Sequence, residues 1–407
     1  MSSSKKLLYF ILAGVVLGLL GGWVFGQAMT SVAWIGTLFL NALKMLVIPL
    51  VISSLIVGVA GLGDITKLGK TGLLTLGYYM VTTAVSVLIG LVLVNLLQPG
   101  VGVSMDSALP EQVAGKTETR LIDVVLSLVS PNLVRSMAEM DILPLIVFSL
   151  VFGAVLTTLG EKGRRVIELF DALNEAVMHM VHLVLYLAPV GIFALVGSKL
   201  GAAGGGAAFW AELLKIGKFA LTVLAGLGLH ALVVLPLILK LVTGRNPWTY
   251  MKNTFEALTT AFSTASSSAT LPVTIECAEE NNRVSRRMAL FVLPIGATVN
   301  MDGTALYEAV AALFIAQMAG MSLGLGEQSV IFITATLAAI GAAGIPEAGL
   351  VTMVLVLQSV GLPLEGIGML LTIDWFLDRC RTTINVWGDS VGAAVVEHLE
   401  LKYVEGG

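Results

Sequence analysis

Long apolar stretches recur along this chain, separated by short polar segments. Three of them, at 7–26, 71–98 and 142–160, contain no charged residue. A helix needs about 20 apolar residues to cross the hydrocarbon core of a bilayer. A membrane β-barrel would instead show short segments of alternating hydrophobicity. The pattern therefore predicts an all-α polytopic membrane protein.

Basic residues set the expected orientation of the first six predicted spans, which cover 7–27, 38–62, 71–98, 120–159, 170–197 and 209–243. Lysines and arginines gather before the first span and after the second, fourth and sixth. Loops rich in Lys and Arg stay in the cytoplasm. We therefore expect cytoplasmic N- and C-termini and an outer loop at 99–120. Short loops and the absence of an N-x-S/T sequon favour a bacterial inner membrane.

The pattern changes after residue 250. Segment 251–280 starts and ends beside basic residues, and its centre, SSS at 266–268, is too polar to face lipid. Irregular backbone is tolerated at membrane depth only where protein or water covers it. We therefore predict a re-entrant helical hairpin over 251–280.

A second set of the same elements follows this hairpin. It consists of a helix over 288–318 broken by NMDGT at 300–304, a second hairpin over 327–365 with GAAGIPEAG near its tip, and a helix over 367–401. Two matching halves that enter from opposite sides form an inverted repeat, which places binding sites near the midplane. The predicted fold is eight transmembrane helices plus two re-entrant helical hairpins with inverted repeats.

Composition agrees with a membrane protein. Of 407 residues, 57% are hydrophobic and 12% charged, with a mean hydropathy of +0.93, whereas soluble domains carry about 25% charged residues. The two cysteines lie far apart and suggest neither a metal site nor a disulfide framework. The sequence predicts no nucleic-acid partner.

The last predicted helix contains a charged run, DWFLDRCRTTINVWGD, from residue 374. In a helix that turns about 100° per residue, five polar residues of this run fall within one arc of about 80°, which we call the polar face. Its members are Asp374, Asp378, Arg381, Asn385 and Asp389. An internal Asp378–Arg381 ion pair would explain this face by helix packing alone. However, three acids face one base, so we favour a face that binds charged solutes.

The chemistry of the polar face suggests those solutes. Arg381 offers a planar fork suited to a carboxylate, and Asp378, one turn away, suits an ammonium group. An amino acid carries both groups. Asp389 and Asn385 offer oxygen ligands for a small hard cation such as Na⁺. The serines at 266–268 lack the turn and oxyanion motif of a nucleophile, so we do not expect an enzyme.

Four motifs resemble one family over about 7–401. SSSATLP at 266–272, NMDGT at 300–304, GIPEAG at 344–349 and DRCRTTINVWGD at 378–389 are similar to those of the glutamate/aspartate transporters, the dicarboxylate/amino acid:cation symporters. Arg379 and Glu308 resemble the animal excitatory amino acid transporters, whereas the short outer loop is typical of a bacterial member. The resemblance implies Na⁺-coupled import of glutamate or aspartate by an elevator-type mechanism, in a homotrimer surrounded by lipid.

The resemblance also implies site residues. The substrate residues would be Arg381 and Asp378 with Ser267, Ser268, Thr304, Ile345, Gly349, Thr382 and Asn385. One Na⁺ would lie on Asp389, Asn385 and carbonyls of Gly296 and Asn300, another on carbonyls of Thr298, Ala339, Ile340 and Ala342, and a third on Tyr79, Thr82, Thr83, Asn300 and Asp302. Glu308 would be the proton carrier.

The family's division of labour assigns scaffold parts to 1–70 and 99–200, and transport-domain parts to 71–98 and 201–407. Several alternatives stay open: a C4-dicarboxylate or proton-only symporter of the same fold, a neutral amino acid carrier, and, from another class, an ion channel. The sequence leaves open the choice between glutamate and aspartate, the stoichiometry, and coupling to H⁺ or K⁺.

Overall fold

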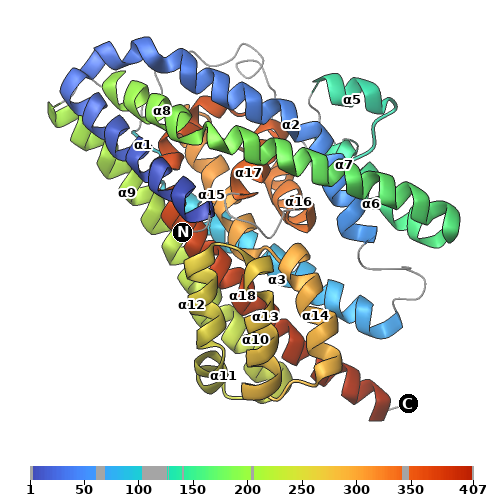
Figure 1. The fold of residues 1–407 in the computed structure, drawn as a ribbon. Helices are drawn as coiled ribbons and strands as arrows, with labels where there is room; N and C mark the ends of the chain where they lie inside the picture. Colours follow the sequence, from blue (N-terminus) through green and yellow to red (C-terminus); the bar gives the residue numbers. More distant parts are fainter. Residues whose placement is uncertain are drawn as a thin grey trace.

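A computed structural model of the chain describes residues 3–60, 69–102, 126, 128–139, 142–202, 206–341 and 348–405. All regular secondary structure in these ranges is helical (Figure 1). The first half contains α1 (Ser3–Phe25), a 3₁₀ segment η1 (Gly26–Val32), α2 (Ala33–Ala60), α3 (Gly69–Leu97), α5 (Leu133–Glu139), α6 (Ile142–Thr158), α7 (Glu161–Tyr186) and α8 (Ala188–Ala202).

Two predicted spans in this half are wrong. The single helix expected over 120–159 is interrupted, because residues 128–132 are not helical and α5 starts afresh. Asn132 caps that start by accepting a hydrogen bond from the Arg135 backbone N–H at 3.1 Å. The span expected over 170–197 begins earlier, at Glu161, and breaks at Leu187. Pro189, just after the break, has no N–H to continue the helical ladder.

Small residues pack α1 tightly against α8. A Cβ added at Gly14 would lie 2.3 Å from the carbonyl oxygen of Pro189, and one at Gly18 would lie 2.9 Å from that of Phe193. Membrane helices approach closely where small residues line the contact, since van der Waals packing drives their association. The α1–α8 pair therefore forms a rigid unit of the first half.

The second half contains α9 (Gly206–Leu229), a π-helical turn η2 (His230–Val234), α10 (Leu235–Thr243), α11 (Pro247–Asn253), α12 (Phe255–Thr264), α13 (Ser267–Glu276), a π-helical turn η3 (Cys277–Asn281), α14 (Arg286–Val299), α15 (Asp302–Met318), α16 (Leu325–Gly341), α17 (Ala348–Ser359), a 3₁₀ turn η4 (Leu364–Gly366) and α18 (Ile367–Glu405). Two packed helical pairs lie in the segments where hairpins are predicted, α12–α13 (hairpin 1) and α16–α17 (hairpin 2), and their re-entrant path stays a prediction. The break between α14 and α15 falls at NMDGT as predicted.

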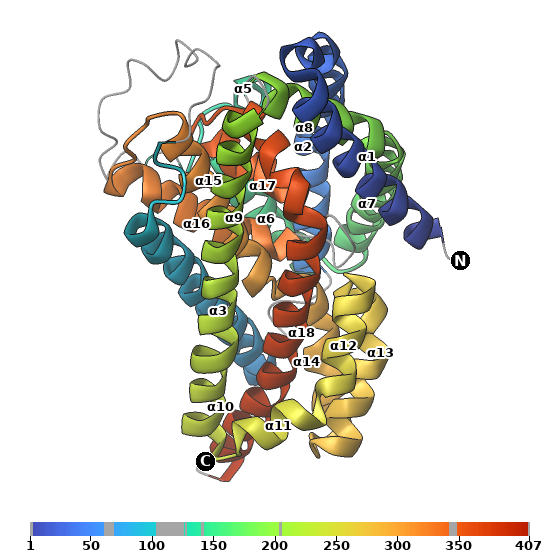
Figure 2. The same ribbon diagram turned by 90° about the vertical axis from the view of Figure 1, so that its left-hand side faces the viewer.

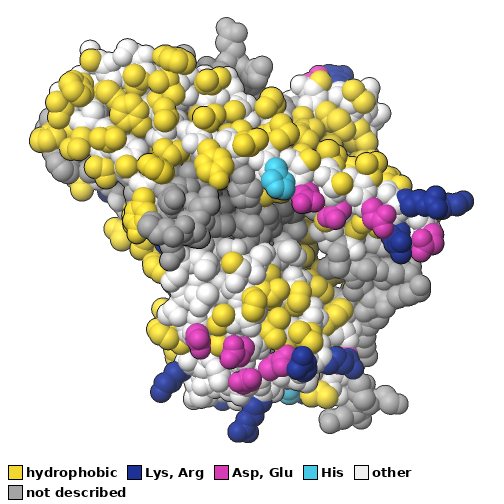
Figure 3. Space-filling view, in the orientation of Figure 1, with side chains coloured by type: hydrophobic (Ala, Val, Ile, Leu, Met, Phe, Trp, Pro, Cys, Tyr) yellow, Lys and Arg dark blue, Asp and Glu magenta, His cyan; other side chains and the backbone are white. Residues whose placement is uncertain are grey.

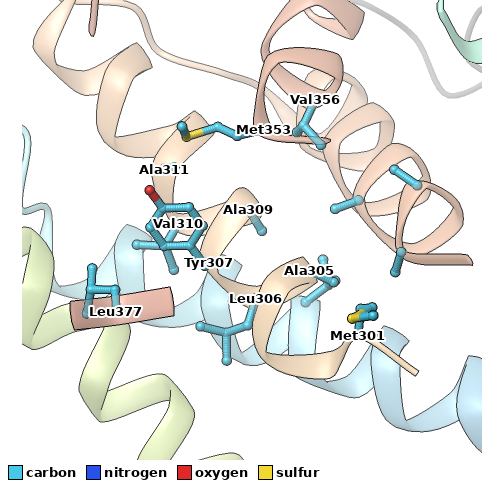
Figure 4. Packing of buried hydrophobic residues seen from close by; sticks show 14 of the residues in the cluster. Met301, Ala305, Leu306, Tyr307, Ala309, Val310, Ala311, Met353, Val356 and Leu377 are labelled. Atoms are coloured by element: carbon cyan, nitrogen blue, oxygen red, sulfur yellow. The ribbon is translucent and has the colours of Figure 1, made fainter. Parts of the chain in front are cut away.

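Helix α15 forms the centre of this half. Of its residues Asp302–Met318, Gln317 is the one that is not buried. Helices α3, α9, α16, α17 and α18 all pack against it, and Figure 2 shows α3, α9 and α18 running alongside one another. Figure 4 shows Met301, Leu306 and Val310 packed together with Met353 and Val356 of α17. The polar groups of α15 other than Gln317 are therefore removed from water.

The surface separates by polarity. Hydrophobic side chains cover the face of α1, α2 and α8, whereas charged side chains gather along α7 and at the end of the molecule near α11 and α13 (Figure 3). Four described helical stretches are long and apolar enough to cross a membrane: Ala13–Phe39, Thr71–Leu97, Ile216–Thr243 and Arg286–Met318. The count of eight spans and the inverted orientation of the two halves stay predictions.

The α1–α8 contact makes a testable prediction for stability. Gly14→Val places a branched side chain against the backbone of Pro189, and overpacking of this kind costs about 1–3 kcal/mol. The thermal unfolding midpoint in detergent should fall by several degrees. Gly77→Val on α3 is the matched control, because no atom lies within 4 Å of its added Cβ. Equal midpoints for the two variants would contradict the tight contact.

Candidate functional site

The polar face of α18 is buried, as the sequence predicted. Its residues Asp374, Asp378, Arg381, Asn385 and Asp389 are each at most 7% exposed. Helices α12, α13, α14 and α15 pack around α18 and cover this face. Charges cannot face lipid at low cost, so they face protein.

Arg381 lies at the centre of the site. Its Nη1 donates to Asp374 Oδ1 and its Nη2 to Asp378 Oδ1, both at 2.8 Å. The Tyr307 ring of α15 lies under the guanidinium carbon, 4.0 Å from the ring centroid. One guanidinium thus bridges two carboxylates, so this group keeps a net negative charge.

Hairpin 2 reaches the same guanidinium through Gly349, near the start of α17. A Cβ added at Gly349 would lie 3.1 Å from Arg381 Nη2 and 3.4 Å from the Thr304 methyl carbon. Thr304 also accepts a long hydrogen bond of 3.4 Å from the Asn385 amide. The structure therefore brings together five predicted substrate residues: Thr304, Gly349, Asp378, Arg381 and Asn385.

The tip of hairpin 1 is fixed by local hydrogen bonds. Ala265 takes a left-handed conformation, with φ of 51°, and Ser266 caps α13 by accepting from the Ala269 N–H at 3.1 Å. Arg379 donates to the carbonyls of Phe262 and Ser263 at the end of α12, at 2.8 and 2.7 Å. A cation at a helix C-terminus is favourable. Arg379 thus joins hairpin 1 to α18 beside Asp378.

The remaining predicted substrate residues differ in their surroundings. Ser267 at the start of α13 and Thr382 on α18 are buried, whereas Ser268 is exposed. Ile345 lies outside the described residues.

One predicted cation group gathers where the chain breaks between α14 and α15. The Asn300 amide donates to Asp389 Oδ1 at 2.9 Å and approaches the Asn385 carbonyl at 3.4 Å. A Cβ at Gly296 would lie 2.5 Å from Asp389 Oδ1, so a glycine leaves this carboxylate beside the helix backbone. The Asn385 side-chain oxygen accepts from the Gly303 N–H at 2.8 Å. All the residues of this group therefore lie around one point.

A second predicted cation group surrounds Asp302, at the first turn of α15. Thr83 of α3 donates to Asp302 Oδ1 at 2.7 Å, and Thr82 donates to Asn300 Oδ1 at 3.4 Å. The Tyr79 hydroxyl, which donates to the Val292 carbonyl at 3.0 Å, lies beside Gly296. The structure thus brings this group together as well, from α3 and from the junction of α14 with α15.

The third predicted cation group is not gathered by any contact of the described residues. Thr298 is exposed and its hydroxyl donates to the Ile295 carbonyl at 3.0 Å. Ala339 and Ile340 are buried, and the Ile340 carbonyl lies 3.1 Å from the Cβ position of Gly58 on α2. Ala342 lies outside the described residues.

Glu308 lies one turn after Thr304 on α15 and has no exposed surface. Both oxygens of its carboxyl group are buried without a hydrogen-bond partner among the described residues. Burial away from water favours the neutral form of a carboxyl group. Glu308 therefore lies in the protein interior, one turn from a predicted substrate residue.

Sequence reasoning missed His230 and Tyr307. His230, in the π-helical turn η2, is fully buried and lies 2.9 Å from Asp302 Oδ2 through its Nε2. One histidine within the apolar run GLGLHALVVLP was a signal, because a buried imidazole needs a polar partner. Tyr307 precedes Glu308 but gave no polar pattern of its own.

These features define a multi-pass membrane protein with a buried charged cluster on α18 that contacts both the α12–α13 pair and the α16–α17 pair. The model of the sodium:dicarboxylate symporter family matches residues 7–399, and the chain belongs to this family. It is therefore a membrane transporter and not an enzyme.

Three relatives show how widely the likeness extends. Excitatory amino acid transporter 1 of Ambystoma tigrinum is 40% identical over 98% of this chain and 84% of its own length. Excitatory amino acid transporter 3 of Mus musculus is 40% identical over 98% of this chain and 86% of its own length. An excitatory amino acid transporter of Caenorhabditis elegans is 40% identical over 96% of this chain and 87% of its own length. The likeness therefore extends over nearly the whole chain.

The Tyr307 ring makes a prediction for ligand affinity. Tyr307→Leu removes the aromatic face under Arg381, and a desolvated cation–π contact contributes about 1–2 kcal/mol. The dissociation constant of an acidic amino acid, measured by calorimetry, should rise roughly tenfold. Tyr307→Phe keeps the ring face and should bind as the native protein does. Native affinity in the leucine variant would show that the ring does not support Arg381.

Proposed function

We propose that this protein is a symporter that imports glutamate or aspartate together with Na⁺. The observation that carries the proposal is the buried Arg381, held between Asp374 and Asp378 under hairpin 2. The family's description names sodium, and the relatives' names specify excitatory amino acids; both support the proposal.

Binding exchanges ion pairs within the site. The side-chain carboxylate of the substrate takes the Nη2 side of Arg381, and the substrate ammonium takes Asp378, which Arg381 releases. Asp374 keeps its bond to Nη1, so the guanidinium stays paired throughout. Because each charge keeps a partner, the exchange avoids leaving a buried ion unpaired, which would cost several kcal/mol.

The charge of the site accounts for the need for cations. Asp374, Asp378, Asp389 and Asp302 are four buried carboxylates against one guanidinium, and an acidic amino acid adds a further negative charge. Buried carboxylates require cations or protons. Na⁺ on the Asp389 and Asp302 groups supplies this charge through oxygen ligands, which suit a hard cation. Substrate and Na⁺ therefore bind more tightly together than separately.

The alternative substrates fit less well. A C4-dicarboxylate brings no ammonium group to replace Arg381 on Asp378. A neutral amino acid brings no second carboxylate to Arg381. An ion channel would leave the pairing of Asp378 and Arg381 without a role.

The finer points of the mechanism are proposals as well. Residues 71–98 and 201–407 act as a transport domain that moves against a scaffold of 1–70 and 99–200, in a homotrimer with cytoplasmic termini in a bacterial inner membrane. Glu308 carries a coupled proton. Its full burial one turn after Thr304 supports this role, since the carboxyl group then lies beside the substrate residues and away from water.

Uptake into proteoliposomes tests the proposal. Radiolabelled aspartate should accumulate against its gradient when Na⁺ is high outside, with the proton and K⁺ gradients collapsed. Accumulation driven by a proton gradient alone, with no effect of Na⁺, would contradict coupling to Na⁺ and favour a proton-only symporter. Passive equilibration in every gradient would favour a channel.

Arg381→Cys tests how the substrate is recognised. Removing the guanidinium should abolish glutamate and aspartate binding and admit small neutral amino acids, because no group then recognises the second carboxylate. Competition by serine and alanine against a labelled amino acid measures the change. If the variant keeps near-native affinity for aspartate, Arg381 does not read the side-chain carboxylate.

Glu308→Gln tests proton coupling. Glutamine mimics the protonated acid, so the variant should bind and exchange substrate but lose the pH dependence of net uptake. Net uptake should also slow, because the empty carrier cannot shed a proton before it returns. Native net uptake with native pH dependence would show instead that Glu308 is a permanent hydrogen-bond donor.

A further inference from the structure

The π-helical turn η2 (His230–Val234) interrupts a helix that otherwise continues from α9 into α10. Its cause is in the sequence HALVVLP, because Pro236 has no N–H to offer the carbonyl of residue 232. The ladder widens here, and the Leu235 N–H bonds to the His230 carbonyl five residues back. Single π-helical turns are frequent at functional sites.

Two polar groups of this turn contact neighbouring elements. The Ala231 carbonyl accepts from the Trp387 indole of α18 at 3.0 Å, which fixes the turn on the polar face's own helix. The fully buried His230 ring places its Nε2 2.9 Å from Asp302 Oδ2. An ionised carboxylate only accepts hydrogen bonds, so the hydrogen lies on Nε2.

The two oxygens of Asp302 are thereby fixed from opposite sides. Thr83 donates to Oδ1 from α3 and His230 donates to Oδ2 from η2. His230 Nδ1 has no hydrogen-bond partner among the described residues. Within these residues, the contact of Nε2 with Asp302 is therefore the one hydrogen bond of the buried ring. A neutral donor orients the carboxylate and leaves its negative charge available to a cation.

We propose that His230 is a positioning residue for the Na⁺ site at Asp302. Its Nε2–H donates to Asp302 Oδ2 and holds this carboxylate in the orientation that binds Na⁺. The proposal rests on the sodium coupling proposed above and requires no change in the protonation of His230. Removing a residue that hydrogen-bonds to a metal ligand typically lowers the affinity for the metal by 10- to 100-fold.

The test compares three substitutions by Na⁺ titration of aspartate binding to the purified full-length protein. His230→Leu removes the donor and should raise the half-saturating Na⁺ concentration roughly tenfold. His230→Gln places an amide N–H near the position of Nε2 and should stay close to native. His230→Asn carries the same amide group as glutamine but reaches only the position of Nδ1. Its half-saturating Na⁺ concentration should therefore resemble that of the leucine variant. At saturating Na⁺, aspartate affinity should recover in all three.

Thr222→Val is the matched control. Thr222 is buried on α9 and donates only to the Lys218 carbonyl of its own helix among the described contacts, at 2.9 Å, so its loss should leave the half-saturating Na⁺ concentration unchanged. The Gln–Asn comparison decides the question even if the leucine variant does not fold. Equal Na⁺ dependence in the glutamine and asparagine variants would overturn the role of His230 alone. Native binding that ignores Na⁺ would overturn this proposal together with sodium coupling.

Discussion

The burial of the Arg381 guanidinium between two carboxylates is the constraint on which the rest of the site depends. A charge removed from water is costly unless it is paired and hydrogen-bonded. Asp374 and Asp378 supply both bonds, and Tyr307 covers the face of the guanidinium. The pairing leaves excess negative charge in an apolar protein, and that excess makes cations part of the mechanism.

Interruptions of helices place further polar groups around this site. The break between α14 and α15 brings Asn300 beside Asp389, and it sets Asp302 at the start of α15, where a helix N-terminus favours an anion. Hairpin 1 ends in a left-handed Ala265, and Arg379 ties the end of α12 to α18. Regular helices carry the apolar surface and the polar face of α18, and the interruptions add further polar groups around that face.

The sequence predicted what depends on local pattern. Hydrophobic length indicated the helices, and the helical period of the last helix placed Asp374 to Asp389 on one buried face. The predicted spans over 120–159 and 170–197 failed because apolar composition does not reveal where a continuous run breaks. His230 was missed because its partner Asp302 is 72 residues away. The predicted cation group that includes Ile340 would bind Na⁺ through backbone carbonyls. Because every residue has a carbonyl, the residue types gave no signal, and only the resemblance to the transporter family suggested this group.

The comparison of aspartate with succinate tests the central claim most directly. The two differ by the ammonium group that we assign to Asp378. We predict that the native protein binds aspartate far more tightly than succinate at saturating Na⁺, and that Asp378→Asn loses most of this difference. Equal affinity of the native protein for both ligands, or an unchanged preference for aspartate in Asp378→Asn, would contradict the exchange of ion pairs around Arg381.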